Sequence, residues 1–409
     1  SPASASDPVA ATSTPAAASP ARTRPMIIAY VFGNFVLGTG VMIATGMLNV
    51  LASSLSVSLA KAGQLVAIPG LVLAIGAPML ALMTARIERR RLLVTATALF
   101  ALGHAACALA PGYLSLLLLR TAALMGVAVF TPQAAASVAL LIPRERQGAA
   151  LATLMVGWSL AAVLGMPAGA LIAAHFGWRA GFGLIAVLAL AAAVWVAIVT
   201  PRGLYVQPIG RAAWSGVFGS HRLVLVLAVT LLTAGGQFVL LTYITPLLDA
   251  ITGSSSAAIA GMMMLFGLFG VTGNIIATRR IDRLGTDRAV LISVWAMLAG
   301  LLLWGVRDLA AAAALAWPLL MASIVLWGLG TFATNSAQQA RLYQTSPLLA
   351  PVSIALNSSC MYAGQTIGAS LGGAGVTLFG PGALPWVASA TMAVGLLVTI
   401  RATGARHVA

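Results

Sequence analysis

The stretches GAPMLALMTARIERRR at residues 76–91 and GNIIATRRIDRLGTDR at residues 273–288 share one pattern. Each begins with a glycine in an apolar segment and carries an arginine ten positions later, Arg86 and Arg283. Further basic residues follow, and another charge-free segment then begins. A pattern that recurs after a long interval indicates an internal repeat. We therefore interpret the chain as two halves of similar length and orientation.

The composition is typical of a membrane protein. The chain is 60% hydrophobic and 7% charged, with a mean hydropathy of +1.02, whereas soluble proteins carry roughly 25% charged residues. Long segments without charged residues, such as the one between Arg24 and Lys61, can each hold a helix of about 20 residues, which is long enough to cross a bilayer. We therefore predict an all-α integral membrane protein.

Counting the charge-free segments predicts twelve transmembrane helices in two pseudo-symmetric six-helix bundles. The bundles are expected at residues 26–200 and 223–402, with a linker at 201–222 between them. Residues 1–25 are rich in Ala, Ser, Pro and Thr and are expected to form a disordered tail, and 403–409 form a second tail. The expected spans are 27–51, 62–84, 92–110, 113–140, 149–173 and 181–200 in the first half, and 223–248, 257–278, 289–306, 317–339, 352–378 and 384–401 in the second.

The formal net charge of +15 could indicate a nucleic-acid partner, but the distribution of the basic residues argues against one. With these spans, the arginines gather at one membrane face, and the other face holds only Lys61, Arg179 and Arg307. The positive-inside rule assigns the arginine-rich face to the cytoplasm. We therefore expect both termini and the linker in the cytoplasm, membrane lipids as partners, and no nucleic acid.

The stretch GWSLAAVLGMPAG at residues 157–169 concentrates residues that reshape a helix. Gly165 and Gly169 lack side chains and Pro167 lacks a backbone donor, so this helix can bend and approach a neighbour closely. Simple close packing of helices explains the glycines but not the whole string.

Together with Gly-Trp-Arg at 177–179, this stretch resembles the antiporter motif of the major facilitator superfamily, in its drug:proton antiporter-1 branch of bacterial sugar, purine-nucleoside and chloramphenicol exporters. The resemblance extends from Met26 to Arg401. It implies the fold of that superfamily, in which helices 1, 4, 7 and 10 line a central cavity. It also implies a monomeric secondary transporter in a bacterial inner membrane. Such a protein exports a small organic or amphiphilic solute (a drug, sugar, nucleoside or organic anion) by alternating access, nominally in exchange for protons.

The loop after the second predicted helix resembles the gating motif of the same superfamily but departs from it at one position. Ala85 stands where the family has an acid, whereas the second half keeps that acid as Asp282. The alternative is that the arginines of these loops only orient the chain in the membrane. The candidate gating residues from both loops and the fifth helix are Gly76, Arg86, Arg90, Gly165, Pro167, Gly169, Asp282 and Arg283.

The helix 1 position that commonly carries an acid in this branch is apolar here. The chain reads Gly-Thr-Gly-Val at 38–41, and Val41 stands in place of the acid. The seven acids of the chain all map to tails, loops or helix ends. Because Val41 cannot carry a proton, two alternatives stay open: a facilitator or exchanger that is independent of protons, and a membrane sensor that binds a solute without transporting it.

Arg120 is the strongest candidate for a charge inside the membrane, where an ionisable residue is a functional hypothesis by default. Its partners could be backbone carbonyls, which would make it structural, or an anionic solute. Uncharged amides and hydroxyls on the cavity helices suit an amphiphilic ligand. The candidate substrate-binding residues are Arg120, Asn34, Asn49, Gln133, Gln237, Tyr243, Asn335, Gln338, Asn357 and Tyr362.

Nothing in the sequence indicates an enzyme. There is no phosphate-binding glycine loop followed by lysine and serine or threonine. The four histidines, two cysteines and seven acids are scattered along the chain, which does not favour a metal site. We expect no catalytic residues, no metal and no cofactor.

Overall fold

A computed structural model describes residues 20–205, 211–253, 255–309 and 313–404. Most of the predicted N-terminal tail therefore lies outside the described residues, as do 206–210 of the predicted linker and 405–409 of the second predicted tail. Within the described ranges the chain is almost entirely helical and contains no strand. The predicted all-α class is confirmed.

The first half of the chain forms one bundle. Its elements are α1 (Pro20–Gly46), α2 (Leu48–Ser54), α3 (Leu59–Met83), α4 (Arg89–Ala108), α5 (Tyr113–Leu141), α6 (Arg144–Leu160), the π-helical turn η1 (Ala161–Gly165), α7 (Met166–Phe176) and α8 (Trp178–Val199). Helices α1 and α2 together form the first span. The fifth span consists of α6, η1 and α7.

The second half forms the other bundle. Its elements are α9 (Arg211–Gly219), α10 (His221–Leu241), α11 (Ile244–Thr252), α12 (Ser256–Leu284), α13 (Thr286–Leu309), α14 (Ala313–Thr345), η2 (Pro347–Leu349), α15 (Ala350–Phe379), η3 (Pro381–Ala383) and α16 (Leu384–Gly404). Helices α10 and α11 form its first span, which is interrupted like α1 and α2. The first span of each half is therefore a broken helix.

The start of the second span is also built alike in the two halves. Ser58 precedes α3 and accepts a hydrogen bond from the backbone nitrogen of Lys61 at 3.2 Å. Ser255 precedes α12 and accepts from the backbone nitrogen of Ala258 at 3.3 Å. Serine is a preferred N-cap because its hydroxyl satisfies one free N–H of the first turn. The repeat seen in the sequence thus has a counterpart in local structure.

Eleven helical segments among the described residues are long and apolar enough to cross a membrane. Helix α15, with 30 residues, is outside that set because Gly, Ser, Thr, Asn and Gln dilute its apolar content. It nevertheless packs between α3 and α10, where small and polar side chains face protein. With α15, the twelve predicted spans are accounted for, and the chain is a multi-pass membrane protein.

Several helix ends differ from the expected boundaries. Helix α1 already begins at Pro20, inside the predicted tail 1–25, and α9 lies inside the predicted linker 201–222. Helix α14 continues to Thr345, beyond the predicted end at 339. Charge-free segments indicate the apolar part of a span, but helical hydrogen bonds continue into polar sequence.

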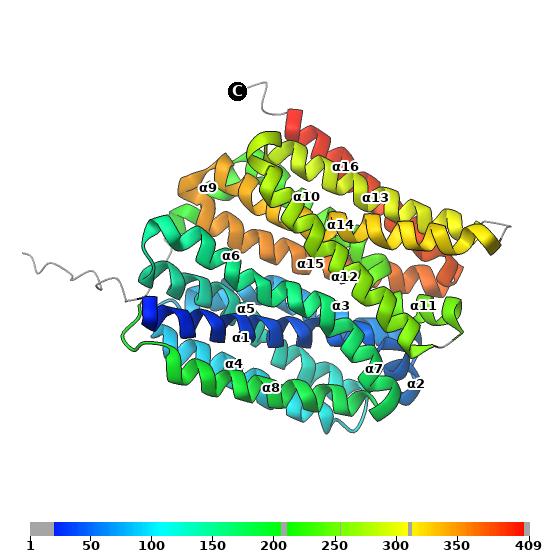
Figure 1. The fold of residues 1–409 in the computed structure, drawn as a ribbon, viewed down its shortest axis with the longest axis horizontal. Helices are drawn as coiled ribbons and strands as arrows, with labels where there is room; N and C mark the ends of the chain where they lie inside the picture. The colour runs from blue at the N-terminus through cyan, green and yellow to red at the C-terminus, as the bar shows by residue number, and fades with distance from the viewer. Residues whose placement is uncertain (1–19, 206–210, 254, 310–312, 405–409) are drawn as a thin grey trace, which may run out of the picture.

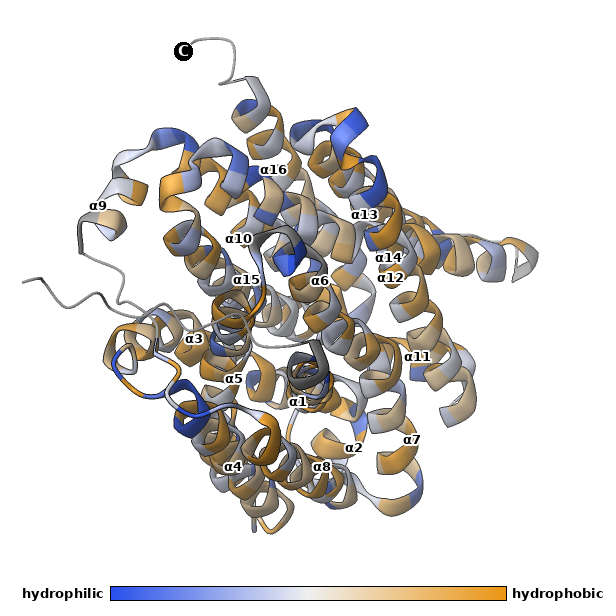
Figure 2. Ribbon diagram, turned by 60° about the vertical axis from the view of Figure 1, so that its left-hand side comes forward, coloured by the Kyte–Doolittle hydropathy of each residue, from blue (hydrophilic) through white to orange (hydrophobic). Residues whose placement is uncertain are grey.

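Figure 1 shows the two bundles as two groups of roughly aligned helices, with α1, α4, α5 and α8 in one and α10, α13, α14 and α16 in the other. Apolar residues dominate the helices in Figure 2, and hydrophilic stretches lie mainly at helix ends. Two buried clusters, one mainly in each bundle, extend across the contact between the bundles. Phe100, Phe130 and Phe182 belong to the first cluster, and Trp304 and Trp327 to the second.

Candidate functional site

The helices run between two opposite ends of the molecule, where the connections between them lie. One, the arginine-rich end, carries α9, the α3–α4 loop with Arg86, and the end of α12 with Arg283. The other, the arginine-poor end, carries the α2–α3 and α11–α12 connections (Figure 1). These two names are kept below.

Hydrogen bonds join the two bundles in the half of the molecule that leads to the arginine-poor end. Thr245 Oγ1 of α11 donates to the carbonyl oxygen of Thr45 at 2.6 Å. Thr45 lies in the last turn of α1, where carbonyls lack their usual intrahelical donors. Nearer the middle of the molecule, Thr366 Oγ1 of α15 donates to the carbonyl oxygen of Ala67 in α3 at 2.9 Å. Direct contact between the bundles therefore closes the arginine-poor end.

Tyr243, a candidate substrate-binding residue, lies in this contact. It occupies the break between α10 and α11, is 1% exposed, and donates from its hydroxyl to the carbonyl oxygen of Ala369 at 2.9 Å. A Cβ atom on Gly63 of α3 or Gly373 of α15 would collide with that hydroxyl. The tyrosine is therefore wedged between the two helices, in a position that stabilises closure.

The fifth span makes the close approaches expected from its motif. A Cβ atom on Gly165 would lie 3.1 Å from Thr39 Cα, and one on Gly169 would lie 2.9 Å from the carbonyl oxygen of Ile43. Both contacts are with α1. Pro167 is the second residue of α7, which follows directly after η1. A π-helical turn is often found at a functional site, and the gating role of these residues stays a prediction.

The same π-helical turn also meets the other bundle. A Cβ atom on Gly267 of α12 would lie 2.6 Å from the carbonyl oxygen of Ala162 in η1. Only glycine fits this separation without a shift of one helix. Gly267 therefore sets how closely α12 approaches the fifth span.

Arg120 is held by the backbone of its own bundle. It is 1% exposed, and its Nε donates to the carbonyl oxygen of Leu65 at 3.0 Å. Its two terminal nitrogens donate to the carbonyl oxygens of Gly40 at 3.0 Å and Val41 at 2.8 Å. The guanidinium carbon also lies 5.8 Å from the centroid of the Phe182 ring. Because each nitrogen already has a carbonyl partner, the geometry favours the structural alternative, in which Arg120 ties α5 to α1 and α3.

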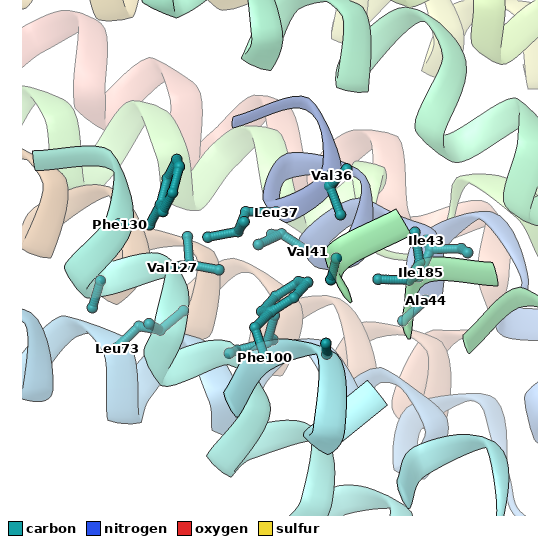
Figure 3. Packing of buried hydrophobic residues seen from close by; sticks show 14 of the residues in the cluster. Val36, Leu37, Val41, Ile43, Ala44, Leu73, Phe100, Val127, Phe130 and Ile185 are labelled. Carbon is teal, nitrogen blue, oxygen red and sulfur yellow. The ribbon is translucent and has the colours of Figure 1, made fainter. Parts of the chain in front are cut away.

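Val41, at the position of the family's acid, belongs to an apolar cluster. Figure 3 shows it near Leu37, Phe100 and Val127, and its side chain is 8% exposed. This part of α1 therefore offers no group that could carry a proton.

Two of the candidate amides are used inside the first bundle. Asn34 donates to the carbonyl oxygen of Leu154 at 3.0 Å and accepts from Thr131 Oγ1 at 2.9 Å. Gln133 Oε1 accepts from an Nη of Arg89 at 2.6 Å. These bonds hold α1, α4, α5 and α6 together.

A column of polar side chains runs through the second bundle. Gln338 of α14 donates to the carbonyl oxygen of Val226 at 2.8 Å and to Thr230 Oγ1 at 3.0 Å. Thr230 in turn donates to Asn357 Oδ1 at 2.6 Å. Asn357 donates to Asn335 Oδ1 at 3.4 Å. The column thus links α10, α14 and α15.

The outer members of this group keep free hydrogen-bonding capacity. Asn335 and Gln237 are half-buried, whereas Gln338 and Asn357 are buried. Gln237 lies two turns beyond Thr230 on the same face of α10, and its amide has no hydrogen-bond partner among the described residues. We take Gln237 and Asn335 as the centre of the candidate solute site.

The remaining two substrate-binding candidates lie in different places. Tyr362 of α15 is 6% exposed and packs with the core of the first bundle, and its hydroxyl has no partner among the described residues. Asn49 lines a cavity at the arginine-poor end. The structure thus separates Asn49 from the polar column.

The first gating loop is tied to its own bundle. Gly76 packs against Met125 of α5. Arg90 donates to the carbonyl oxygen of Ala197 in α8. These contacts do not bridge the two bundles.

Three further gating candidates at the arginine-rich end are exposed. They are Arg86, Asp282 and Arg283. Asp282 forms no ion pair with any residue that the structure describes. In this conformation, therefore, these three side chains do not hold the arginine-rich end shut.

A buried ion pair was missed by the sequence reasoning. Arg341 is 0% exposed, and its Nε lies 2.6 Å from Asp287 Oδ1. An Nη of Arg222 lies 3.9 Å from Asp287 Oδ2. The charge pattern of the sequence predicts a position at a membrane face for both the acid and the arginine. The available signal was helical spacing: Arg341 follows Gln338 by one turn and joins the pair to the polar column at 3.5 Å.

Comparison with known proteins gives one family. A model of the Major Facilitator Superfamily matches residues 30–296. The uncharacterized MFS-type transporter YbcL of Bacillus subtilis (strain 168) is 28% identical, over 90% of this chain and 92% of that protein. The probable sugar efflux transporter of Mannheimia succiniciproducens is 28% identical, over 85% of each chain. The inner membrane transport protein YdhP of Escherichia coli (strain K12) is also 28% identical, over 85% of this chain and 88% of that one.

Solved structures show the same fold at low sequence identity. A D-xylose-proton symporter superposes with a TM-score of 0.75 at 16% identity, over 92% of this chain and 97% of the other. A bacterial homologue of the human lysosomal transporter Spinster, in an inward-facing and unoccupied conformation, gives a TM-score of 0.70 at 16% identity, over 94% and 96%.

Proposed function

This chain belongs to the Major Facilitator Superfamily, and on that premise we propose that it exports a small neutral solute with several hydroxyl groups, such as a sugar, by alternating access. The family and the names of the relatives make it a transporter and not an enzyme. The solute class, the direction and the energy source are the parts proposed here.

The proposal of a neutral solute rests on the hydrogen bonds of Arg120. Three of its five N–H donors bond to backbone carbonyls, and the side chain is buried within the first bundle, so it does not present its charge to an organic anion. The half-buried groups with remaining capacity, Gln237 and Asn335, are amides, which both donate to and accept from hydroxyls. Relatives named as probable sugar efflux transporters support the same class.

Solute counterflow in proteoliposomes tests this proposal. Vesicles that contain the full chain are loaded with an unlabelled solute and then diluted into the labelled one, with sugars, nucleosides, organic anions and drugs compared. We expect transient accumulation of a neutral sugar and none of an organic anion. Gln237→Ala should lower the accumulation about tenfold, because a solute hydroxyl loses its hydrogen-bonding partner.

The matched control for this test is Gln147→Ala. The amide of Gln147 donates to the carbonyl oxygens of Ala139 and Ile142 within the first bundle, so its loss should leave counterflow near the wild-type level. Counterflow of organic anions without sugars would contradict the proposed solute class. An undiminished rate in Gln237→Ala would contradict the proposed site.

We further propose that the arginine-rich end faces the cytoplasm of a bacterial inner membrane, as the positive-inside rule indicates. The closed arginine-poor end then faces outward, and the solute is loaded from the cytoplasm, as export requires. A monomer suffices because one chain supplies both bundles. In cells, a membrane-impermeant thiol reagent should label a cysteine at Ser54 but not one at Ile87, and the opposite pattern would reverse the orientation.

Energy coupling by proton antiport needs a titratable side chain, and Val41 does not supply one. The group must therefore lie elsewhere in the chain. Among the acids whose side chains are described, Asp287 is the buried one, at 5% exposure. Protonation of its carboxyl would weaken the pair with Arg341, which contacts the polar column through Gln338. We therefore propose Asp287 as the coupling carboxylate. The absence of an acid at Val41 favours the alternative of a facilitator or exchanger, in which the ion pair is only structural.

A further inference from the structure

The cavity that Asn49 lines at the arginine-poor end has a volume of about 650 Å³. Its walls come from α1, α2 and α7 of the first bundle and from α11 and α12 of the second. Ser53, Ser56 and Ala174 on its lining are exposed, so the cavity is open to solvent at this end. Sites for drug-sized molecules have volumes of roughly 300–1,000 Å³. Because the cavity shares no lining residue with Gln237 or Asn335, it is distinct from the candidate solute site.

The lining of this cavity mixes apolar and polar side chains and carries one charge. Asp249 of α11 is the single ionisable side chain among the lining residues. Its carboxylate is half-buried and has no ion pair or hydrogen bond with the residues that the structure describes. The other polar groups that line the cavity are the amide of Asn49 and the hydroxyls of Ser53, Ser56, Thr245 and Ser256.

A carboxylate without a protein partner in such a setting favours a cation with hydrogen-bond donors, because charge-assisted bonds are the stronger ones. The neighbouring hydroxyl and amide oxygens can accept further donors. A compact organic ammonium ion with several amine or hydroxyl groups matches both properties.

We propose that this cavity binds a small organic cation of the polyamine or amino-sugar kind and that the bound cation holds the arginine-poor end closed. Both bundles contribute walls, and Thr245, which bonds to Thr45 across the interface, lines the cavity. Separation of the bundles at this end would divide the site. A ligand that binds one conformation better shifts the population toward it, so the cation acts as a conformational inhibitor from the outer side.

Calorimetric binding of spermidine and glucosamine to the full chain in nanodiscs of zwitterionic lipid tests the proposal. Neutral lipid removes the anionic headgroups that would bind an amine by themselves. We expect saturable binding by the wild type, about tenfold weaker binding by Asp249→Asn, and binding close to wild type by Asp249→Glu. Ala174→Trp should weaken binding by filling the cavity without a change of charge.

Hydrogen exchange supplies the second readout. Bound cation should protect the backbone amides of α2 and α11, and this protection should be lost in Asp249→Asn. Binding that neither Asp249→Asn nor Ala174→Trp weakens would overturn the proposal, as would the absence of binding of both probes to the wild type. Because no transport is measured, failure of the sugar counterflow experiment would leave this result unaffected.

Discussion

Arg120 shows at the scale of one residue how a charge deep in a membrane protein is stabilised without a counter-ion among the described residues. Three backbone carbonyls from two neighbouring helices accept its hydrogen bonds. Arg120→Ala removes these bonds and should lower the free energy of unfolding by about 3 kcal/mol. Thermal unfolding of the protein in detergent checks this. A variant of unchanged stability that loses only the binding of anionic solutes would instead show that Arg120 binds solute.

Tyr243 gives a prediction about closure of the arginine-poor end. Tyr243→Phe removes the hydroxyl that packs against Gly63 of the first bundle and is held there by the Ala369 carbonyl of its own bundle. Loss of this contact between the bundles, about 1 kcal/mol, should shift the closed-to-open ratio about fivefold. The measurement is maleimide labelling of a cysteine at Ala62, which is buried where the bundles meet, with Cys107 and Cys360 replaced by serine. We expect faster labelling.

Tyr113→Phe is the control for this experiment. The Tyr113 hydroxyl donates to the Lys61 carbonyl at 2.8 Å inside one bundle, so the same chemical change should leave labelling at Ala62 unchanged. Equal rates in the two variants would show that the Tyr243 hydroxyl does not stabilise closure.

Asp287 gives a prediction about energy coupling. Asp287→Asn cannot release a proton, so sugar counterflow should persist while an imposed pH gradient no longer drives accumulation. Asp287→Glu should retain the response to the gradient. Accumulation that stays gradient-driven in Asp287→Asn would exclude this carboxylate, and a wild type without any response would support the facilitator alternative.

At the scale of elements, the contact between α12 and the π-helical turn depends on Gly267. Gly267→Ala places a methyl group 2.6 Å from the Ala162 carbonyl oxygen, so one of the two bundles must shift and the closed arginine-poor end should be less populated. Gly261→Ala on the same helix is the control, because a Cβ atom there meets no other atom within 4 Å. The labelling assay at Ala62 compares them, and identical rates would contradict a gating role for this contact.

The helices were predictable from the sequence because the length of a charge-free segment and the glycine or serine residues at its ends are local properties. The pairing of polar groups was not, since it depends on which helices meet. Arg120 could be identified as a buried charge, but its carbonyl partners lie on α1 and α3. Tyr243 is a residue type that often contacts ligands, but here it packs between two helices that carry glycines at the contact. Arg341 lies beyond the predicted end of its span at residue 339, whereas α14 continues to Thr345 and buries it.

At the scale of the whole molecule, two similar bundles are joined unequally at their two ends. Hydrogen bonds and glycine contacts close the arginine-poor end, whereas Asp282 and Arg283 at the other end remain exposed. Alternating access requires such a difference between the two ends, because two similar bundles rock about the site between them. The central claim is therefore that the two ends open and close in opposition.

Electron–electron distance measurements on two spin-label pairs test that claim most directly. One pair joins Ser54 and Ala257 at the arginine-poor end, and the other joins Ile87 and Leu284 at the arginine-rich end, all four exposed. With a saturating solute identified by counterflow, we expect a second population in which the first distance lengthens and the second shortens. Distances that stay fixed at both ends while the solute binds, or that change in the same direction, would contradict alternating access.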